Sequence, residues 1–187
     1  MSTALSTTTA PLTAEEFAER PDPGHREELV RGRIVPMPMP KPRHGEICNR
    51  VGRILGDCAE SRDLGRVLNN DTGVITERAP DTVRGADVAF YSFARVPKGP
   101  LPDRYLDAPP DLVVEVLSPS DRWPRVLAKV AEYLEAGTTL VIVLDDQRKE
   151  AHLYRADGAP RTLGAYESLA VPDLLGDFQV EVGRFFE

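Results

Sequence analysis

The sequence predicts an α/β fold built on buried parallel strands. Two segments, 111–117 (DLVVEVL) and 140–144 (LVIVL), are almost continuously apolar, which is typical of strands covered on both faces. Residues 124–136 between them have a helical pattern that begins at Pro124 and stops before Gly137. A strand, a helix and a strand in this order form a β-α-β unit, so the two strands should run parallel with a right-handed crossover.

Shorter elements surround this unit. We expect a loose, Ser/Thr-rich tail over 1–11 and a single domain over 12–187. From the N-terminus, the patterns predict a helix over 14–19, a hairpin over 28–35, a helix over 44–61, short strands over 66–68, 74–76 and 86–91, a long loop over 96–110 and, after the β-α-β unit, a hairpin turning at 157–158. We find no internal repeat.

Local signals support the first of these elements. Thr13 and Glu16 form a capping box that begins the helix over 14–19. Arg31-Gly32 lies between two apolar pairs, as in a hairpin turn. In the helix over 44–61, apolar residues return every three or four positions, at Ile47, Val51, Ile54, Leu55 and Cys58.

Composition and charge exclude several classes of protein. The 187 residues are 41% hydrophobic, so the chain has enough apolar material for a core. No apolar run approaches the ~20 residues that span a bilayer, and the N-terminus lacks the features of a signal peptide, so we expect a cytoplasmic protein without a membrane partner. The net charge of −7 argues against a protein that coats nucleic acid by bulk charge.

Charge is nevertheless unevenly distributed. Residues 31–66 contain eight Arg or Lys and four acids, whereas residues 145–187 contain five bases and nine acids. The first segment therefore forms either a local cationic face or a solvated helix surface with scattered arginines.

Two acids lie in otherwise apolar strands. Glu115 is in the middle of the segment 111–117, where burial of a charge is costly unless the charge is paired or binds a metal. Asp87 begins a second apolar segment, 28 residues earlier. Neighbouring strands lie ~4.8 Å apart, so the two carboxylates can share one cation, and such oxygen ligands suit Mg²⁺ or Mn²⁺. The alternative for Glu115 is a buried ion pair with an arginine.

Three further residues have a functional and an ordinary interpretation. Lys129 lies at the border of the apolar stripe of its helix, from which it can reach the Glu115 strand or extend into solvent. Glu28 is either an acidic residue of the same site as Asp87 and Glu115 or a solvent-facing residue of its strand. His44 contacts a phosphate at the helix N-terminus or is simply a polar first-turn residue.

Other chemistries find no support in the sequence. Cys48 and Cys58 are ten residues apart on one predicted helix, about 15 Å, so they can share neither a zinc ion nor a disulfide. The chain has no GxGxxG, Walker A or GxSxG motif. Ser118 and Ser120 follow a strand, but no histidine is placed to activate them.

Several motifs together resemble a known family, the Uma-type restriction endonucleases of the PD-(D/E)XK nuclease superfamily. The matching segments are 11–17 (PLTAEEF), 28–32 (ELVRG), 42–44 (PRH), 71–73 (DTG), 82–90 (TVRGADVAF), 108–120 (APPDLVVEVLSPS) and 129–137 (KVAEYLEAG). They are collinear and cover nearly the whole chain.

The resemblance implies a restriction-endonuclease-like fold, with a central mixed sheet and flanking helices. It implies that Asp87 is the signature aspartate and Glu115 the second acid, although Ala86 stands where the signature has proline. Leu117 stands where the signature has lysine, and the family lysine has moved to the next helix, at Lys129. Glu28 matches a family glutamate on the first strand, but Glu27 and Arg31 beside it depart from the family pattern.

The activity that the resemblance implies is Mg²⁺-dependent (or Mn²⁺-dependent) cleavage of nucleic acid, with DNA as the expected substrate. Asp87, Glu115 and a main-chain carbonyl near Val116 would hold the metal, Lys129 would orient water or stabilise charge, and Glu28 would complete the metal shell or accept a proton.

Two expectations concern partners. Phosphate contacts are expected from the start of the basic helix, at Arg43, His44, Arg50 and Arg53. A homodimer is also expected, because two sites can cut two strands and Phe185-Phe186 offers apolar surface. The alternatives are a nuclease-fold protein that binds nucleic acid or a partner chain without cutting, and a structural dimer.

Overall fold

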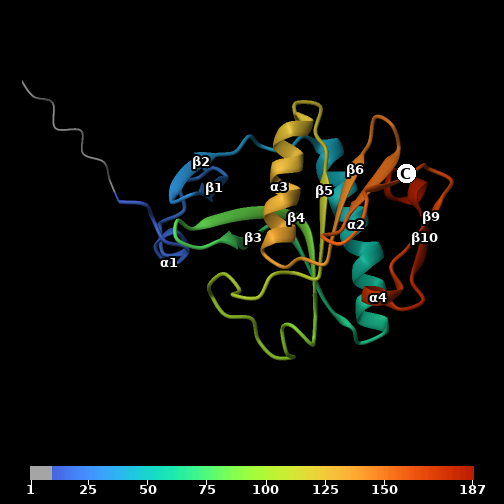
Figure 1. The fold of residues 1–187 in the computed structure, drawn as a ribbon, viewed down its shortest axis with the longest axis horizontal. Helices are drawn as coiled ribbons and strands as arrows, with labels where there is room; N and C mark the ends of the chain where they lie inside the picture. The colour runs from blue at the N-terminus through green and yellow to red at the C-terminus, as the bar shows by residue number, and fades with distance from the viewer. Residues whose placement is uncertain (1–9) are drawn as a thin grey trace, which may run out of the picture.

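The computed structural model describes residues 10–187, so most of the predicted tail over 1–11 lies outside the described residues. The described part has an eight-stranded mixed β-sheet with helices on both faces, as Figure 1 shows, and a separate two-stranded sheet near the C-terminus. The elements are α1 (Ala14–Ala18), β1 (Glu27–Val30), β2 (Arg33–Pro36), α2 (Pro42–Ser61), β3 (Gly65–Glu77), β4 (Thr82–Ser92), β5 (Leu112–Val116), α3 (Trp123–Glu135), β6 (Leu140–Asp145), β7 (Glu150–Tyr154), β8 (Arg161–Leu163), β9 (Ser168–Ala170), α4 (Pro172–Leu175), β10 (Gln179–Glu181) and the 3₁₀ turn η1 (Val182–Phe185).

The sheet confirms the predicted fold class. Its strand order is β2-β1-β4-β5-β6-β7-β8, with β3 also paired to β4. Strands β5 and β6 are parallel, with Leu112 opposite Leu140, and α3 is their crossover. The other pairs in this sheet are antiparallel, including the β7–β8 hairpin expected around 157–158.

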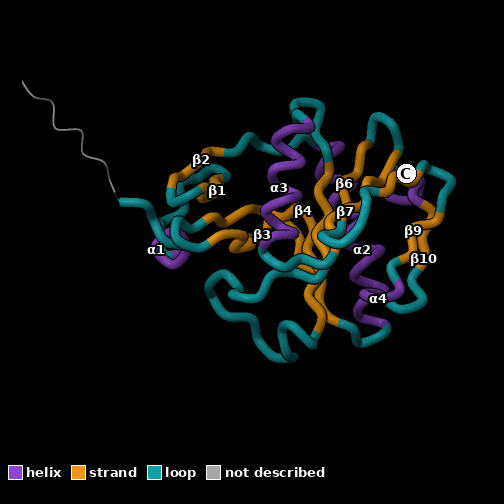
Figure 2. Tube along the Cα trace, viewed as in Figure 1, coloured by secondary structure: helices purple, strands orange, loops and turns teal. Residues whose placement is uncertain are grey.

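The two faces of the sheet are covered by different helices, because side chains alternate along each strand. Val88, Val114 and Ile142 pack against α2 and the C-terminal elements. Their neighbours on the other face, such as Ala89 and Val113, pack against α3. Figures 1 and 2 show α3 and α2 on opposite sides of the central strands.

The bounds of β3, β4 and α2 differ from expectation, and β4 begins at Thr82, four residues before the expected strand over 86–91. The short strands over 66–68 and 74–76 are parts of one long strand, β3, interrupted by a bulge between Asn69 and Thr72. Asn70 and Asp71 in this bulge have positive φ, which asparagine and aspartate tolerate better than most residues. Helix α2 begins two residues earlier than expected, because Pro42 suits the first helical position.

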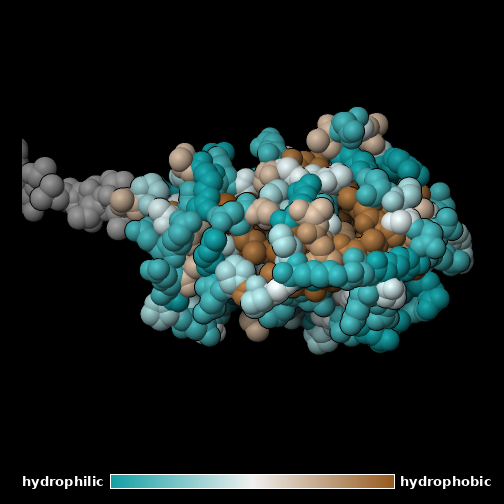
Figure 3. Space-filling model, turned by 90° about the horizontal axis from the view of Figure 1, so that it is seen from below, coloured by the Kyte–Doolittle hydropathy of each residue, from teal (hydrophilic) through white to brown (hydrophobic). Residues whose placement is uncertain are grey.

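The C-terminal phenylalanines do not offer the apolar surface expected of them. Phe185 and Phe186 are 2% and 7% exposed and belong to the core beneath α2. Apolar residues do reach the surface elsewhere: they gather at the centre of the face seen in Figure 3, bordered by hydrophilic residues. In the described part of the chain, no helix combines the length and the apolarity needed to cross a membrane.

Candidate active site

A fork in the sheet creates the site. One edge of β4 is paired with β3 from Thr82 to Ser92, with an interruption at Asp87 opposite the β3 bulge. The other edge pairs with β1 at Val83 and with β5 from Val88 to Phe90. Within the described residues, no strand pairs with this edge between Val83 and Val88, so β1 and β5 separate there. The backbone groups of β4 in the fork are therefore free to bind side chains.

Asp87 and Glu115 lie at the closed end of the fork, where the Val116 N–H next to Glu115 donates to Asp87. The β4–β5 register pairs Val88 with Val114, and one further step places Asp87 opposite Glu115. Residues directly opposite in an antiparallel pair have Cβ atoms about 4.5–5.5 Å apart on one face. The two acids therefore lie on neighbouring strands, as expected, and their sharing of one cation stays a prediction.

Helix α3 supplies two partners for Glu115. Lys129 Nζ lies 2.9 Å from Glu115 Oε2, and the Tyr133 hydroxyl donates to Oε1 at 2.9 Å. These donors are four residues apart, so they project from one side of the helix. Burial raises the pKa of Glu115 to about 7, although Lys129 acts in the opposite direction.

Lys129 also joins Glu115 to Glu28. Its ammonium group donates to the Gly85 carbonyl at 2.8 Å and lies 3.4 Å from Glu28 Oε1. Burial lowers the pKa of Lys129, but the charges of Glu115, Glu28 and Asp87 outweigh it and raise the pKa above its usual value. Lys129 therefore remains a cation and does not extend into solvent as its ordinary interpretation required.

Glu28 is buried in the fork, only 4% exposed. Its Oε1 accepts a hydrogen bond from the Gly85 N–H at 3.1 Å, and its Oε2 accepts one from Arg84 at 2.8 Å. Arg84 in turn makes a bidentate ion pair with Glu132 of α3. Glu28 is thus not a solvent-facing residue, and its carboxylate links β1, β4 and α3.

Asp87 is held from two other directions. Its Oδ2 accepts a hydrogen bond from the Val116 N–H at 2.8 Å and lies 3.3 Å from His44 Nε2. Burial raises the pKa of Asp87, but His44, Lys129 and the Val116 N–H outweigh it and hold the pKa below its usual value. The contact with Asp87 raises the pKa of His44.

The donor set fits a divalent cation. No hydrogen bond from a described residue reaches Asp87 Oδ1, although Asp87 is only 7% exposed. Four carboxylates, from Glu28, Asp87, Glu115 and Glu132, lie around Lys129, Arg84 and His44, so acids outnumber bases in the site. Oxygen ligands with such a charge balance are what Mg²⁺ and Mn²⁺ prefer.

The residues expected to contact phosphate do not form one surface. Arg43 binds Asp146, Glu46 and the Phe186 carbonyl, so its guanidinium anchors the C-terminus. Arg50 is half-buried, and Arg53 is exposed about half a turn around α2 from His44. Of the four, His44 is the one in contact with the acidic residues of the site.

Internal ion pairs also reduce the charge of the basic segment 31–66. Arg62 pairs with Asp177 and Arg43 with Asp146, so bases of this segment contact acids of the C-terminal segment. The charge separation expected along the sequence is therefore partly neutralised in the folded chain.

Sequence reasoning missed three members of the site: Tyr133, Arg84 and Cys48. From its spacing Tyr133 belongs to the apolar side of its helix, whereas in the structure its hydroxyl donates a hydrogen bond to Glu115. Cys48 was considered only as a partner of Cys58. Its spacing of four residues from His44 was the available signal, because such residues lie side by side on a helix.

Two pockets flank His44. One, of about 250 Å³, lies next to Asp87 and the β3 bulge and includes Cys48, Asn69 and Asp71 in its wall. The other, of about 190 Å³, lies between the starts of α2 and α3 and is lined partly by Ile47, Leu117 and Trp123. The first pocket therefore opens beside an acid of the fork, whereas the second borders His44 but none of the three acids.

A sheet that forks around three acids and a helix-borne lysine is the arrangement of a nuclease-fold protein. Comparison with known families agrees: the Uma2 family, described as "Putative restriction endonuclease", matches residues 14–183. The chain therefore belongs to the Uma2 family.

A solved structure shares this fold. It is a protein from Anabaena variabilis ATCC 29413 whose structure is described as that of "a putative nuclease". The TM-score is 0.81 at 20% sequence identity, and the match covers 94% of this chain and 98% of the other. Among curated proteins, none matches the chain.

Proposed function

We propose that this protein is a metal-dependent nuclease that hydrolyses phosphodiester bonds, with Mg²⁺ or Mn²⁺ as cofactor and DNA as substrate. The observation that carries the proposal is the proximity of the acids on β4 and β5: the Val116 N–H donates to Asp87, and Lys129 donates to Glu115. Membership of a family described as "Putative restriction endonuclease" supports the same reaction.

The metal ligands in this proposal are Asp87, Glu115 and the Val116 carbonyl. The Val116 N–H already ties the end of β5 to Asp87, which keeps the backbone at this position close to the carboxylate. A bound divalent ion supplies a water of lowered pKa and neutralises charge on the scissile phosphate.

The other site residues act on water and on phosphate charge. Lys129 is a fixed cation beside Glu115, so it can orient the attacking water or stabilise the negative charge that develops on phosphorus oxygens. Glu28 holds Lys129 from the opposite side and can complete the metal shell or accept a proton through water. Tyr133 fixes the orientation of Glu115.

Nucleic-acid binding is proposed to depend on backbone phosphates. The proposed contacts are four residues of α2: His44, at the edge of the site, and Arg43, Arg50 and Arg53. A homodimer acting in the cytoplasm is part of the same proposal, because a duplex has two strands to cut.

Cleavage of labelled nucleic acid tests the proposal. Single- and double-stranded DNA and RNA are each incubated with the full chain and Mg²⁺ or Mn²⁺, and then with chelator in place of the metal. We expect metal-dependent cleavage of DNA that falls at least about 100-fold in Asp87→Asn. The control is Asp57→Asn, an exposed aspartate of α2 that should leave the rate unchanged.

The alternative is a protein of nuclease fold that binds nucleic acid or a partner chain without cutting. It is favoured by the ion-paired state of Arg43 and the overall charge of −7, which limit electrostatic attraction of phosphate. Tight binding without cleavage of any of the four substrates would establish this alternative.

A further inference from the structure

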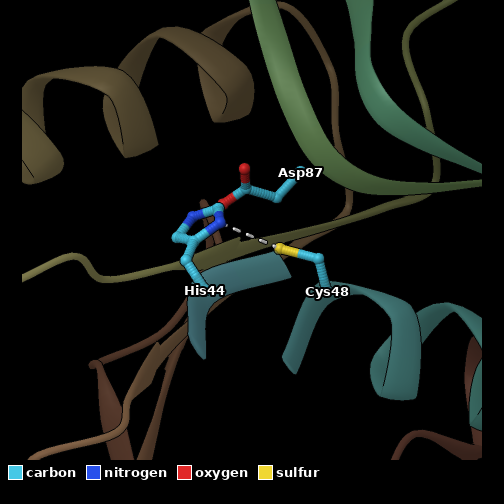
Figure 4. Close-up of side chains that lie close together, drawn as sticks. All are labelled: His44, Cys48 and Asp87. Atoms are coloured by element: carbon cyan, nitrogen blue, oxygen red, sulfur yellow. Dashed lines mark hydrogen bonds and ion pairs between the residues drawn. The ribbon is translucent and has the colours of Figure 1, made fainter. Parts of the chain in front are cut away.

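A second group of metal-binding side chains lies beside the acids of the fork. His44 and Cys48 are one turn apart on α2 and point toward Asp87 of β4, as Figure 4 shows. His44 lies between the other two: its Nδ1 is 3.4 Å from Cys48 Sγ, and its Nε2 is 3.3 Å from Asp87 Oδ2. One ligand atom from each residue lies within 4.8 Å of the others.

These separations are close to those of a metal site. Ligands at about 2.0–2.3 Å from a tetrahedral zinc ion are about 3.3–3.8 Å from one another. The ligand atoms must therefore approach by at most about 1.5 Å, and one nitrogen of His44 must turn toward the ion. Rotation of the side chains can provide both movements, because the three residues border a pocket of about 250 Å³.

The surrounding backbone fixes where these side chains lie. Gly52 of α2 approaches β3 so closely that a Cβ there would be 2.3 Å from the Asn69 side chain. The β3 bulge places Asp71 at the same pocket, where it pairs with Arg26. Helix α2 is thereby held against β3 and β4, with His44 and Cys48 toward the acids.

We propose that His44, Cys48 and Asp87 form a binding site for a thiophilic divalent cation, Zn²⁺ being the expected ion. A thiolate, an imidazole and a carboxylate are zinc ligands, and three protein ligands leave the fourth position of the tetrahedron to water. Mg²⁺ does not compete for the sulfur, because it prefers oxygen ligands in an octahedron. The sequence argues against zinc because no cysteine or histidine is expected near Asp87 and Glu115, whereas the packing of α2 against β4 brings His44 and Cys48 to Asp87.

This site shares Asp87 with the proposed magnesium site. A zinc ion bound to Asp87 removes a ligand from Mg²⁺, so zinc inhibits cleavage. This consequence rests on the proposed function, whereas the binding of zinc does not.

Cobalt binding tests the site directly. Co²⁺ is added to the metal-free full chain, and the near-ultraviolet absorption that arises from a thiolate bound to cobalt is recorded. We expect this band in the wild type and in Cys58→Ser, and its loss in Cys48→Ser and in Cys48→Ala. Cys58 is the matched control, because it lies on the same helix and contacts Leu175 and Arg62, away from His44.

Zinc affinity gives a second readout. Competition with a chromophoric chelator should show that Zn²⁺ binds Cys48→Ser at least about tenfold more weakly than the wild type, because loss of a ligand costs no less than loss of an outer-shell partner. The proposal is overturned if the wild type shows no band at one equivalent of Co²⁺, if the band survives in both Cys48 variants, or if zinc affinity is the same in the wild type and Cys48→Ser.

Cleavage separates the two proposals. With Mg²⁺ fixed, one equivalent of Zn²⁺ should suppress cleavage by the wild type, and undiminished cleavage would refute the sharing of Asp87. A wild type that shows the cobalt band but no magnesium-supported cleavage supports the zinc site and refutes the proposed function.

Discussion

Lys129 makes contacts that an ordinary surface lysine lacks. Its ammonium group lies within 3.4 Å of Glu115, Glu28 and the Gly85 carbonyl, and its side chain is 19% exposed. A lysine held by so many acceptors has little freedom to pair elsewhere. Its position relative to Glu115 is therefore fixed before substrate binds, which is what stabilisation of developing charge requires.

Replacement of this lysine should affect turnover more than binding. In Lys129→Met the helix keeps a long, flexible side chain, but the cation is lost. We expect the cleavage rate to fall about 10²–10³-fold, with little change in nucleic-acid affinity. Single-turnover cleavage and filter binding measure the two quantities.

The control for this substitution is Lys98→Met, because Lys98 is an exposed lysine paired with Asp63. An unchanged rate in Lys129→Met would return Lys129 to the role of a structural ion-pair partner.

Particular residues show how far sequence could define the site. Glu115 and Asp87 were identifiable because burial of a charge in an apolar strand is costly unless the charge is paired or binds a metal. Glu28 alone carried no such signal, because its burial arises only where β1 and β5 separate along β4. His44 could be placed at a helix start, but its contact with Asp87 depends on the packing of α2 against β4.

Helix α2 combines two roles on different sides. Its buried side carries Ile47, Val51 and Leu55, and its first turn carries His44 toward the site. Arg53 projects to solvent, and Arg50 is half-buried with its Nε unpaired among the described residues. The arginines of α2 therefore remain candidates for phosphate contacts outside the fork.

The salt dependence of binding tests these arginines. Each phosphate contact contributes about −0.9 to the log–log slope of affinity against salt on B-DNA. Replacement of Arg50 and Arg53 by glutamine should flatten the slope by up to about 2 and weaken binding to all sequences equally. Titrations at several salt concentrations measure both effects.

Two results would contradict the assignment of phosphate contacts. Loss of affinity for one sequence alone would show that the arginines contact bases. An unchanged slope would show that the exposed side of α2 is simply solvated surface.

Helix α1 is attached to the sheet through Asp81. This buried carboxylate accepts hydrogen bonds from the N–H groups of Ala14 and Ala79 and from Arg78. Burial raises the pKa of Asp81, but these donors outweigh it and hold the pKa below its usual value. The ionised form therefore stabilises the folded chain.

The stability of the chain should depend on pH through this residue. Because the folded pKa is depressed, the stabilisation is present above the unfolded pKa of about 3.9 and is lost as pH falls through the folded pKa. Asp81→Asn should cost about 1–3 kcal/mol of unfolding free energy at pH 7 and much less in strong acid. Urea unfolding at pH 7 and in strong acid measures the loss of unfolding free energy in Asp81→Asn. An equal loss at both pH values would exclude stabilisation by the ionised Asp81 carboxylate.

The expected strands show which elements the hydrophobic pattern of the sequence can predict and which it cannot. The β-α-β unit was predictable because its strands are apolar on both faces. Strand β3 was divided in the prediction because its central residues, Asn69 to Thr72, are polar and turn-forming. In the folded chain β4 pairs with β3 on both sides of the bulge, so tertiary pairing overrides the local signal.

At the scale of the molecule, a single fork gives one site per chain. A duplex has two strands, so a symmetric pair of chains is expected for its cleavage. The apolar terminus Phe185-Phe186 cannot form the interface, because it is buried. The apolar surface at the centre of Figure 3 is a more suitable contact.

Light scattering tests the pairing. At high micromolar concentration the full chain should have the mass of two copies of the 20.6 kDa chain. A monomeric mass across that range would mean that one chain acts alone and cuts one strand at a time.

The central claim is that Asp87 and Glu115 together hold one divalent cation. Calorimetric titration of Mg²⁺ into the metal-free protein tests it most directly, in the wild type and in Asp87→Asn, Glu115→Gln and the control Asp57→Asn. We predict one Mg²⁺ per chain in the wild type and control, and binding at least about tenfold weaker in each of the other two variants. Equal Mg²⁺ affinity in all four proteins would contradict the claim.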